Sequence, residues 1–218
     1  MPEYIKLCLD TWKHDYIMLT YDNLNQYTSL PIDKLKYFTL PQVADIVRVH
    51  VLRDNGGYWL DTDTIMITDE LPTEDMMGFV EQRTNTIGYL HTSPNSQMFM
   101  EWAEYQDVIL NSSVIDRSAW DIVGNRFTDA YVKWHEEITI CDVSNKWAET
   151  YMIKDMQSRY DKYRKFYFGT TYHLSDLRPT NMLMLHNSWT PNAYKILPTK
   201  EAILNQNCTL SNILKEVL

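Results

Sequence analysis

Apolar residues recur along this chain with two different periods, and the alternation of these periods predicts helices interleaved with strands. Helices are expected over residues 3 to 14, 22 to 28, 42 to 54 and 95 to 110, and from about Ala119 or Asp121 onward. Strands are expected over residues 16 to 20, 58 to 67, 78 to 82, 86 to 90, 137 to 141, 164 to 168 and 181 to 186, with a weaker strand pattern at 35 to 39. Such alternation is typical of an α/β domain with a mainly parallel sheet flanked by helices. Without a linker or repeat, residues 1 to 218 are expected to form a single domain.

The most informative segment joins the helix expected at 42 to 54 to the strand that follows it. The helix is followed by Gly56 and Gly57, as a helix C-terminus commonly is, and the next apolar run carries Asp61 and Asp63. Carboxylates two residues apart on a strand point to opposite faces, so both reach one cation only if the strand ends there and the backbone turns. Hard oxygen ligands of this kind suit Mg²⁺ or Mn²⁺ holding a diphosphate.

Two further polar groups are candidates for a ligand site. Asp45 and Arg48 lie at i and i+3 on the helix expected at 42 to 54, which is apolar over most of its girth, so the charged pair is expected to face a cleft. The alternative is an ordinary ion pair on a solvated surface. His186, followed by Asn187, Ser188 and Trp189, comes directly after an apolar strand, and here the alternative is a histidine satisfied in the core beside a tryptophan.

Composition excludes some classes of partner. The net charge is −9 and the isoelectric point is near 5.1, so nucleic acid is not an expected partner. No apolar run has the roughly 20 residues of a transmembrane helix, and no secretory leader is recognised. Three cysteines without a recognisable spacing favour reduced thiols and a cytoplasmic location. A cytoplasmic location is compatible with peripheral association of the protein with a membrane.

The motifs together resemble a known family. Ala44 to Arg48, the Gly56-Gly57 pair and Leu60 to Asp63 are similar to the sugar-binding DxD region of retaining glycosyltransferases with the GT-A fold, in particular the capsular-polysaccharide-synthesis and Och1-like group. Leu185 to Thr190 resembles the C-terminal active-site loop of that group. The resemblance covers about two thirds of the chain.

The resemblance implies a GT-A-like mixed sheet and transfer of a hexose from a nucleoside-diphosphate sugar, expected to be a UDP-sugar, with retention of configuration. The acceptor would be a saccharide, a lipid-linked saccharide or a glycoprotein glycan in surface polysaccharide or glycan biosynthesis. The implied residue roles are Mn²⁺ or Mg²⁺ bound by Asp61, Asp63 and His186, and donor contacts from Asp45, Arg48, Asp61, Asp63, Ser188 and Trp189. The family's usual first strand, with its Ile-His-x-x-Trp-like run, is expected to be absent.

Two other functions fit part of the same pattern. Leu60 to Ile65 also matches the Asp-x-Asp-x-Thr signature of haloacid-dehalogenase-type phosphatases, in which Asp61 would be the nucleophile. That fold normally opens with this strand and needs a later acidic cluster, and the sequence has neither feature. A catalytically degenerate module that binds sugar nucleotides is the other alternative, given the expected loss of the first strand.

Overall fold

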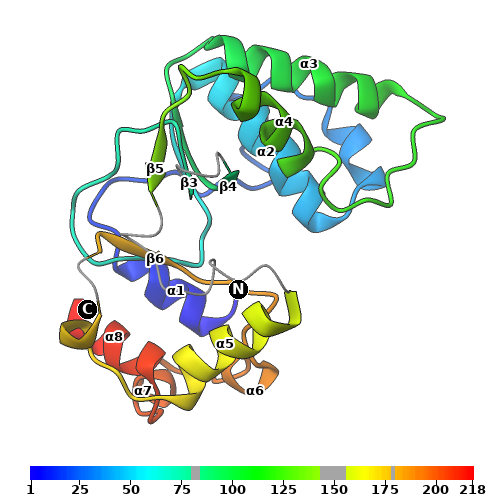
Figure 1. Cartoon of the computed structure of the whole chain (residues 1–218). Helices are drawn as coiled ribbons and strands as arrows, with labels where there is room; N and C mark the ends of the chain where they lie inside the picture. Colours follow the sequence, from blue (N-terminus) through cyan, green and yellow to red (C-terminus); the bar gives the residue numbers. More distant parts are fainter. Residues whose placement is uncertain (80–83, 143–155, 178–179) are drawn as a thin grey trace. The chain divides into compact units, whose positions relative to one another are not determined.

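The structure is a computed structural model that describes residues 1–79, 84–142, 156–177 and 180–218. The chain forms two compact units, each assembled from separate stretches (Figure 1). Unit 1 contains residues 1–16, 61–71 and 143–218, and unit 2 contains residues 17–60 and 72–142. Because the chain leaves unit 1 and returns to it, neither unit is a continuous half of the sequence. The single domain expected over 1–218 stays a prediction.

Unit 2 contains a small mixed sheet with the strand order β1-β4-β3-β5. Its strands are β1 (Gly57–Leu60), β3 (Met76–Phe79), β4 (Thr84–Thr92) and β5 (Ile140–Asp142). Strands β1 and β3 each pair antiparallel with β4, whereas β3 pairs parallel with β5. The expected mainly parallel sheet is therefore corrected to a mixed, partly antiparallel one. The four residues between β3 and β4 are too few for the crossover that a parallel pair requires.

Helices cover this sheet and supply most of the core of unit 2. They are α2 (Leu40–Asn55), α3 (Gln97–Asn111) and α4 (Asn125–Trp134), preceded by the 3₁₀-helices η1 (Leu24–Gln26) and η2 (Ile32–Tyr37). Helix α2 packs against α3, and α3 packs against α4, as Figure 1 shows. Val49 of α2, Leu90 of β4 and Trp102 of α3 are fully buried in one cluster. These contacts confirm the amphipathic helices expected at 42 to 54 and 95 to 110.

Local chemistry sets both ends of α2. At its start the Thr39 N–H donates to Gln42 Oε1 at 2.9 Å, which is one half of a capping box. At its end Gly56 has φ of 67°, a left-handed conformation that side chains disfavour. A Cβ on Gly56 would also lie 2.6 Å from the backbone nitrogen of Pro94. The glycine that ends the helix is thus required by both its φ angle and its close neighbour.

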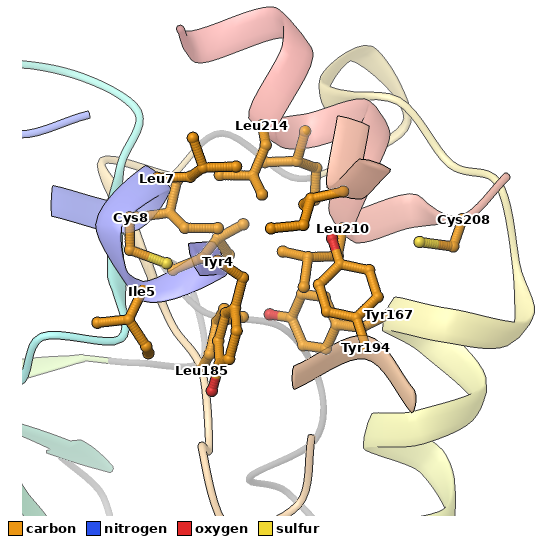
Figure 2. Packing of buried hydrophobic residues seen from close by; sticks show 14 of the residues in the cluster. Tyr4, Ile5, Leu7, Cys8, Tyr167, Leu185, Tyr194, Cys208, Leu210 and Leu214 are labelled. Carbon is orange, nitrogen blue, oxygen red and sulfur yellow. The ribbon is translucent and has the colours of Figure 1, made fainter. Parts of the chain in front are cut away.

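Unit 1 is a helical cluster with a two-stranded sheet. Its elements are α1 (Glu3–Asp10), β2 (Thr64–Met66), α5 (Met156–Gly169), η5 (Leu174–Asp176), β6 (Met182–Met184), α6 (Asn192–Lys195), α7 (Lys200–Leu204) and α8 (Thr209–Val217). Strands β2 and β6 pair antiparallel. Figure 2 shows Tyr4, Leu7 and Cys8 of α1 packed in one core with Tyr194 and Leu214.

The chain after α1 is fastened to β2 in this unit. Trp12 Nε1 donates to the Thr64 carbonyl at 2.8 Å, and the Met66 N–H donates to Thr11 Oγ1 at 2.8 Å. The two bonds place the N-terminal helix beside the strand that follows the acid pair.

Several local predictions need correction. Residues 16 to 20 form no strand, and residues 35 to 39 include the end of η2 rather than a strand. The run 164 to 168 belongs to helix α5, because Tyr163 and Tyr167, one turn apart, bury one face against the core. The strand expected at 58 to 67 is two strands, β1 and β2. Part of the strand expected at 78 to 82 lies outside the described residues.

Candidate functional site

The acid pair lies where the chain turns between β1 and β2. The Thr64 N–H donates to the Asp61 carbonyl at 3.0 Å, which closes a turn over residues 61 to 64. Asp61 and Asp63 are both partly exposed. The chain therefore turns at the acid pair instead of continuing as one strand. A turn of this kind also holds the carboxylates at the surface, where a ligand can reach them.

Asp63 is tied to a segment more than a hundred residues away in the sequence. The Asn187 N–H donates to Asp63 Oδ2 at 2.8 Å, and the Leu185 N–H donates to the Asp63 carbonyl at 2.9 Å. The chain segment after β6 is thereby brought against the acid pair. The sequence motifs at 61 to 63 and 186 to 190, predicted separately, belong to one place in unit 1.

The segment 186 to 190, here called the His186 loop, folds back on itself. The His186 carbonyl accepts from the Trp189 N–H at 2.9 Å and from the Thr190 N–H at 3.0 Å. The imidazole of His186 packs on the Trp189 ring, with centroids 4.1 Å apart, and edge-on to Tyr163 at 5.7 Å. Ser188 is exposed at the tip of the loop. The structure thus brings His186, Ser188 and Trp189 together in one compact turn.

Helices α1 and α5 support the His186 loop through buried hydroxyl groups. Tyr163 Oη accepts from the His186 N–H at 3.2 Å and lies 3.1 Å from Thr190 Oγ1. Tyr4 Oη donates to Asn187 Oδ1. Burial raises the pKa of both tyrosines well above the usual range, so both phenols stay neutral and able to donate. A guanidinium contributes as well, because Arg164 Nε donates to the Trp189 carbonyl at 3.0 Å.

Asp45 and Arg48 lie in unit 2 and form a buried ion pair. Arg48 Nη2 is 3.1 Å from Asp45 Oδ1, and the residues are 4% (Arg48) and 7% (Asp45) exposed. Arg48 also donates through Nε to the Ala44 carbonyl at 3.3 Å and through Nη1 to the Ile87 carbonyl of β4. Its guanidinium lies over the Trp59 ring, 5.1 Å from the centroid. The solvated surface pair that the sequence left open as an alternative is therefore excluded.

Gly124, directly before α4, closes over this ion pair. A Cβ at Gly124 would lie 2.5 Å from Asp45 Oδ2 and 2.9 Å from Ile87 Cδ1. Because the carboxylate is held by Arg48, it cannot move aside cheaply. The absence of a side chain at position 124 is thus part of how Asp45 is packed.

The predicted site residues accordingly fall into two groups. Unit 1 holds Asp61, Asp63 and the His186 loop, and unit 2 holds the Asp45–Arg48 pair. Among residues 1–79, 84–142, 156–177 and 180–218, no three His, Cys, Asp or Glu side chains are arranged to hold a metal ion. Metal ligation by His186 beside Asp61 and Asp63 stays a prediction. Two carboxylates with phosphate oxygens and water remain a chemically sufficient set for Mg²⁺.

The sequence did not identify the residues that hydrogen-bond the His186 loop and hold it in place. Tyr4, Tyr163 and Arg164 carry no motif that would assign them a role. For the tyrosines a weak signal is present, since a buried phenol needs a hydrogen-bond partner. Nothing in the sequence identifies that partner, because Asn187 and Tyr4 lie 183 positions apart.

Comparison with known proteins decides the family. A model of the capsular polysaccharide synthesis protein family matches residues 1–142. The chain belongs to this family. The match includes the Asp45–Arg48 pair and the acid pair at 61 and 63, and it ends before the His186 loop. No curated protein and no solved structure matches the chain significantly. In the part of the chain that the structure describes, every helix is too short or too polar to span a bilayer.

Proposed function

We propose that this member of the capsular polysaccharide synthesis protein family is a metal-dependent glycosyltransferase. It transfers a hexose from a nucleoside-diphosphate sugar, with UDP-sugars as the first donors to test, to a hydroxyl of a growing saccharide. The acceptor is a free, lipid-linked or protein-linked glycan, and the anomeric configuration is retained. The observation that carries the proposal is the hydrogen bond between Asn187 N–H and Asp63 Oδ2, which joins the acid pair to the polar His186 loop.

The acid pair is the proposed metal site. The carboxylates of Asp61 and Asp63 are hard donors on one turn, partly exposed, and their chemistry fits Mn²⁺ or Mg²⁺ shared with a diphosphate. The ion, when bound, stabilises the charge that develops on the leaving diphosphate. The protein's own contribution is to hold the two carboxylates in place before the donor arrives, so that little reorganisation is needed.

The His186 loop is proposed to contact the donor beside the acid pair. Ser188 is exposed at the loop tip, and its hydroxyl can donate to a phosphate oxygen. The Trp189 indole supplies a flat apolar surface and one N–H donor. His186 would bind the ion as a neutral imidazole.

The Asp45–Arg48 pair of unit 2 is proposed as a donor-binding group, with Asp45 contacting the nucleoside or sugar and Arg48 contacting the diphosphate or sugar hydroxyls. The burial of both residues supports a functional or structural role for the ion pair rather than an ordinary solvated surface pair. Several Arg48 donors already hold Ala44, Ile87 and Asp45, so the guanidinium orientation is fixed in advance. A fixed guanidinium binds an anion with less loss of side-chain freedom than a mobile one.

The phosphatase alternative is disfavoured by the surroundings of the acid pair. That fold normally opens with the strand that carries the acid pair, whereas about sixty residues precede Asp61 here, and the sequence after the pair lacks the later acidic motif that the phosphatases need. The degenerate binding module differs from the enzyme only in turnover, so the experiment below separates them.

The proposal is tested by screening nucleotide sugars with the purified protein. A donor present at a hundred times its dissociation constant adds about 2.7 kcal/mol to stability. For a chain of this length, such a gain is expected to raise the melting temperature by roughly 5–10 °C. A shift that requires Mn²⁺, together with release of the nucleoside diphosphate, supports the transferase. A shift without release over long incubation with saccharide acceptors supports the binding module, and no shift with any donor contradicts both.

A further inference from the structure

We propose that Tyr4 and Asn187 form a hydrogen-bonded support that positions Asp63 for the donor-bound metal ion. The inference rests on the proposed function and extends it to residues outside the recognised motifs. Tyr4 and Asn187 are assigned a positioning role, because each acts on the ion through Asp63.

The support consists of two successive hydrogen bonds within unit 1. Tyr4 Oη donates to the side-chain carbonyl of Asn187, and the backbone N–H of the same asparagine donates to Asp63 Oδ2 at 2.8 Å. One residue thus accepts a bond from the core through its side chain and gives a bond to the carboxylate through its backbone. Fixing the side chain of Asn187 therefore fixes the direction of its N–H.

The end of this hydrogen-bonded support at Tyr4 is held firmly by the core. Tyr4 is fully buried, and its ring packs edge-on to Tyr194 at 6.0 Å between centroids. Figure 2 shows Tyr4 among the side chains of α1 and its neighbours Leu7 and Cys8. A buried hydroxyl without a partner costs roughly 1–3 kcal/mol, and the bond to Asn187 Oδ1 helps to satisfy this phenol. The position of Asn187 is thereby coupled to the hydrophobic core.

The other end of the hydrogen-bonded support is the partly exposed turn that carries Asp63. Asn187 and Ser188 are exposed, and a loop with this exposure would sample many backbone conformations on its own. A second hydroxyl, that of Tyr163, accepts the neighbouring His186 N–H at 3.2 Å. Two tyrosines from α1 and α5 therefore hold consecutive residues of the loop, Tyr163 through the His186 N–H and Tyr4 through the Asn187 side chain. The arrangement resembles the outer hydrogen bonds that orient metal-binding carboxylates in metalloproteins.

The test removes the Tyr4 hydroxyl and nothing else. In Tyr4→Phe the ring still fills the core, but Asn187 loses its anchor. Outer partners of metal-binding groups are worth about 10- to 100-fold in metal affinity. Since Tyr4 acts through one intermediate residue, we expect the Mn²⁺ dissociation constant, measured calorimetrically in the presence of UDP, to rise about 10-fold.

A second readout needs no metal. The Asn187 N–H donates to Asp63 Oδ2, so we expect its hydrogen exchange to be slowed in the metal-free protein. In Tyr4→Phe this exchange should accelerate about 10-fold relative to wild type, while amides of β2 and β6 exchange as before.

Tyr194→Phe is the matched control. Tyr194 is buried in the same core, and its hydroxyl lies 3.1 Å from Ser211 Oγ of α8. We expect this variant to lower the melting temperature by an amount similar to Tyr4→Phe. Its Mn²⁺ affinity and its Asn187 exchange rate should match wild type.

Asn187→Ala keeps the test decisive should Tyr4→Phe not fold, because position 187 is exposed. It should weaken Mn²⁺ binding to the same extent, and the double variant should be no worse than either single change. Wild-type Mn²⁺ affinity in Tyr4→Phe and Asn187→Ala would overturn the inference. If the wild-type protein binds no Mn²⁺ with UDP, the proposed function fails and the positioning role with it. Faster Asn187 exchange would then show a structural contact alone.

Discussion

Replacing Arg48 by lysine tests whether the buried ion pair of unit 2 depends on the shape of the guanidinium. Arg48 makes directional contacts to Asp45 Oδ1, to the Ala44 carbonyl and to the Ile87 carbonyl. A lysine keeps the charge but presents it as a point on a flexible stem. It can hold Asp45 or Ile87, but it has no planar fork with which to hold all three.

The expected cost follows from the hydrogen bonds that a lysine cannot make. Hydrogen bonds to charged groups are each worth about 1.5–3 kcal/mol, and relaxation around a smaller head recovers part of this. We therefore expect Arg48→Lys to lower the free energy of unfolding by about 2–3 kcal/mol. Removing the partner charge entirely, in Arg48→Met, should cost about 3–5 kcal/mol, because Asp45 is then left as a buried charge.

The assay is urea denaturation followed by circular dichroism, with Arg126→Lys as the matched control. Arg126 Nη2 lies 2.9 Å from Asp121 Oδ1, and this pair belongs to the same unit but is well exposed. An exposed pair is worth at most about 1 kcal/mol, so the control should lose little stability. A loss under about 0.5 kcal/mol in Arg48→Lys would refute the buried geometry. If the folded Arg48→Lys protein also binds UDP-sugar more weakly, the direct donor contact is supported.

Three further predictions follow from single positions. Burial lowers the pKa of His50 from 6.5 to about 4. Between about pH 6.5 and pH 4 the unfolded chain therefore binds a proton at this histidine that the folded protein does not bind. Wild type should lose about 2 kcal/mol of stability from this residue between about pH 7.5 and pH 5, and an unchanged pH dependence in His50→Gln would contradict this. Gly124→Ala should cost about 1–3 kcal/mol by urea denaturation, because its Cβ overlaps Asp45, and a neutral change would refute the close packing. His186→Ala should weaken Mn²⁺ binding about 10- to 100-fold if the imidazole is a ligand, whereas a lower melting temperature with unchanged Mn²⁺ affinity removes it from the site.

The parts of the fold that can be predicted from sequence are those set by neighbouring residues. Helix α2 is predictable because its periodicity, its capping residues and Gly56 act within one turn of each end. The turn at Asp61 and Asp63 is only half predictable, because the apolar run at 58 to 67 indicates one strand and a turn is required only if both acids bind one cation. Such signals lie within a few residues and need no knowledge of the rest of the chain.

Other features depend on partners far along the sequence. A strand is expected at 164 to 168 because the aromatic run Phe166 to Phe168 has the composition of a strand. In the structure this run belongs to helix α5, which is stabilised by packing against α8 and the core. The antiparallel pairing of β1 with β4 escapes prediction for a similar reason, because β2 and β3 come between these two strands in the sequence. The contact between Asn187 and Asp63 spans 124 positions, so neither residue carries a local sign of the other.

The central claim is that Asp61 and Asp63 bind the divalent ion of a nucleotide-sugar donor. The most direct measurement is a calorimetric Mn²⁺ titration in the presence of UDP, paired with UDP release from UDP-sugar, on wild type, Asp61→Asn, Asp63→Asn and the control Asp69→Asn, an exposed acid of the same unit. Wild type and Asp69→Asn should bind Mn²⁺ alike and release UDP, whereas either motif variant should stay folded, bind Mn²⁺ weakly and lose roughly 10²-fold in rate. Unchanged Mn²⁺ binding and UDP release in both motif variants, or full release in the presence of EDTA, would contradict the account.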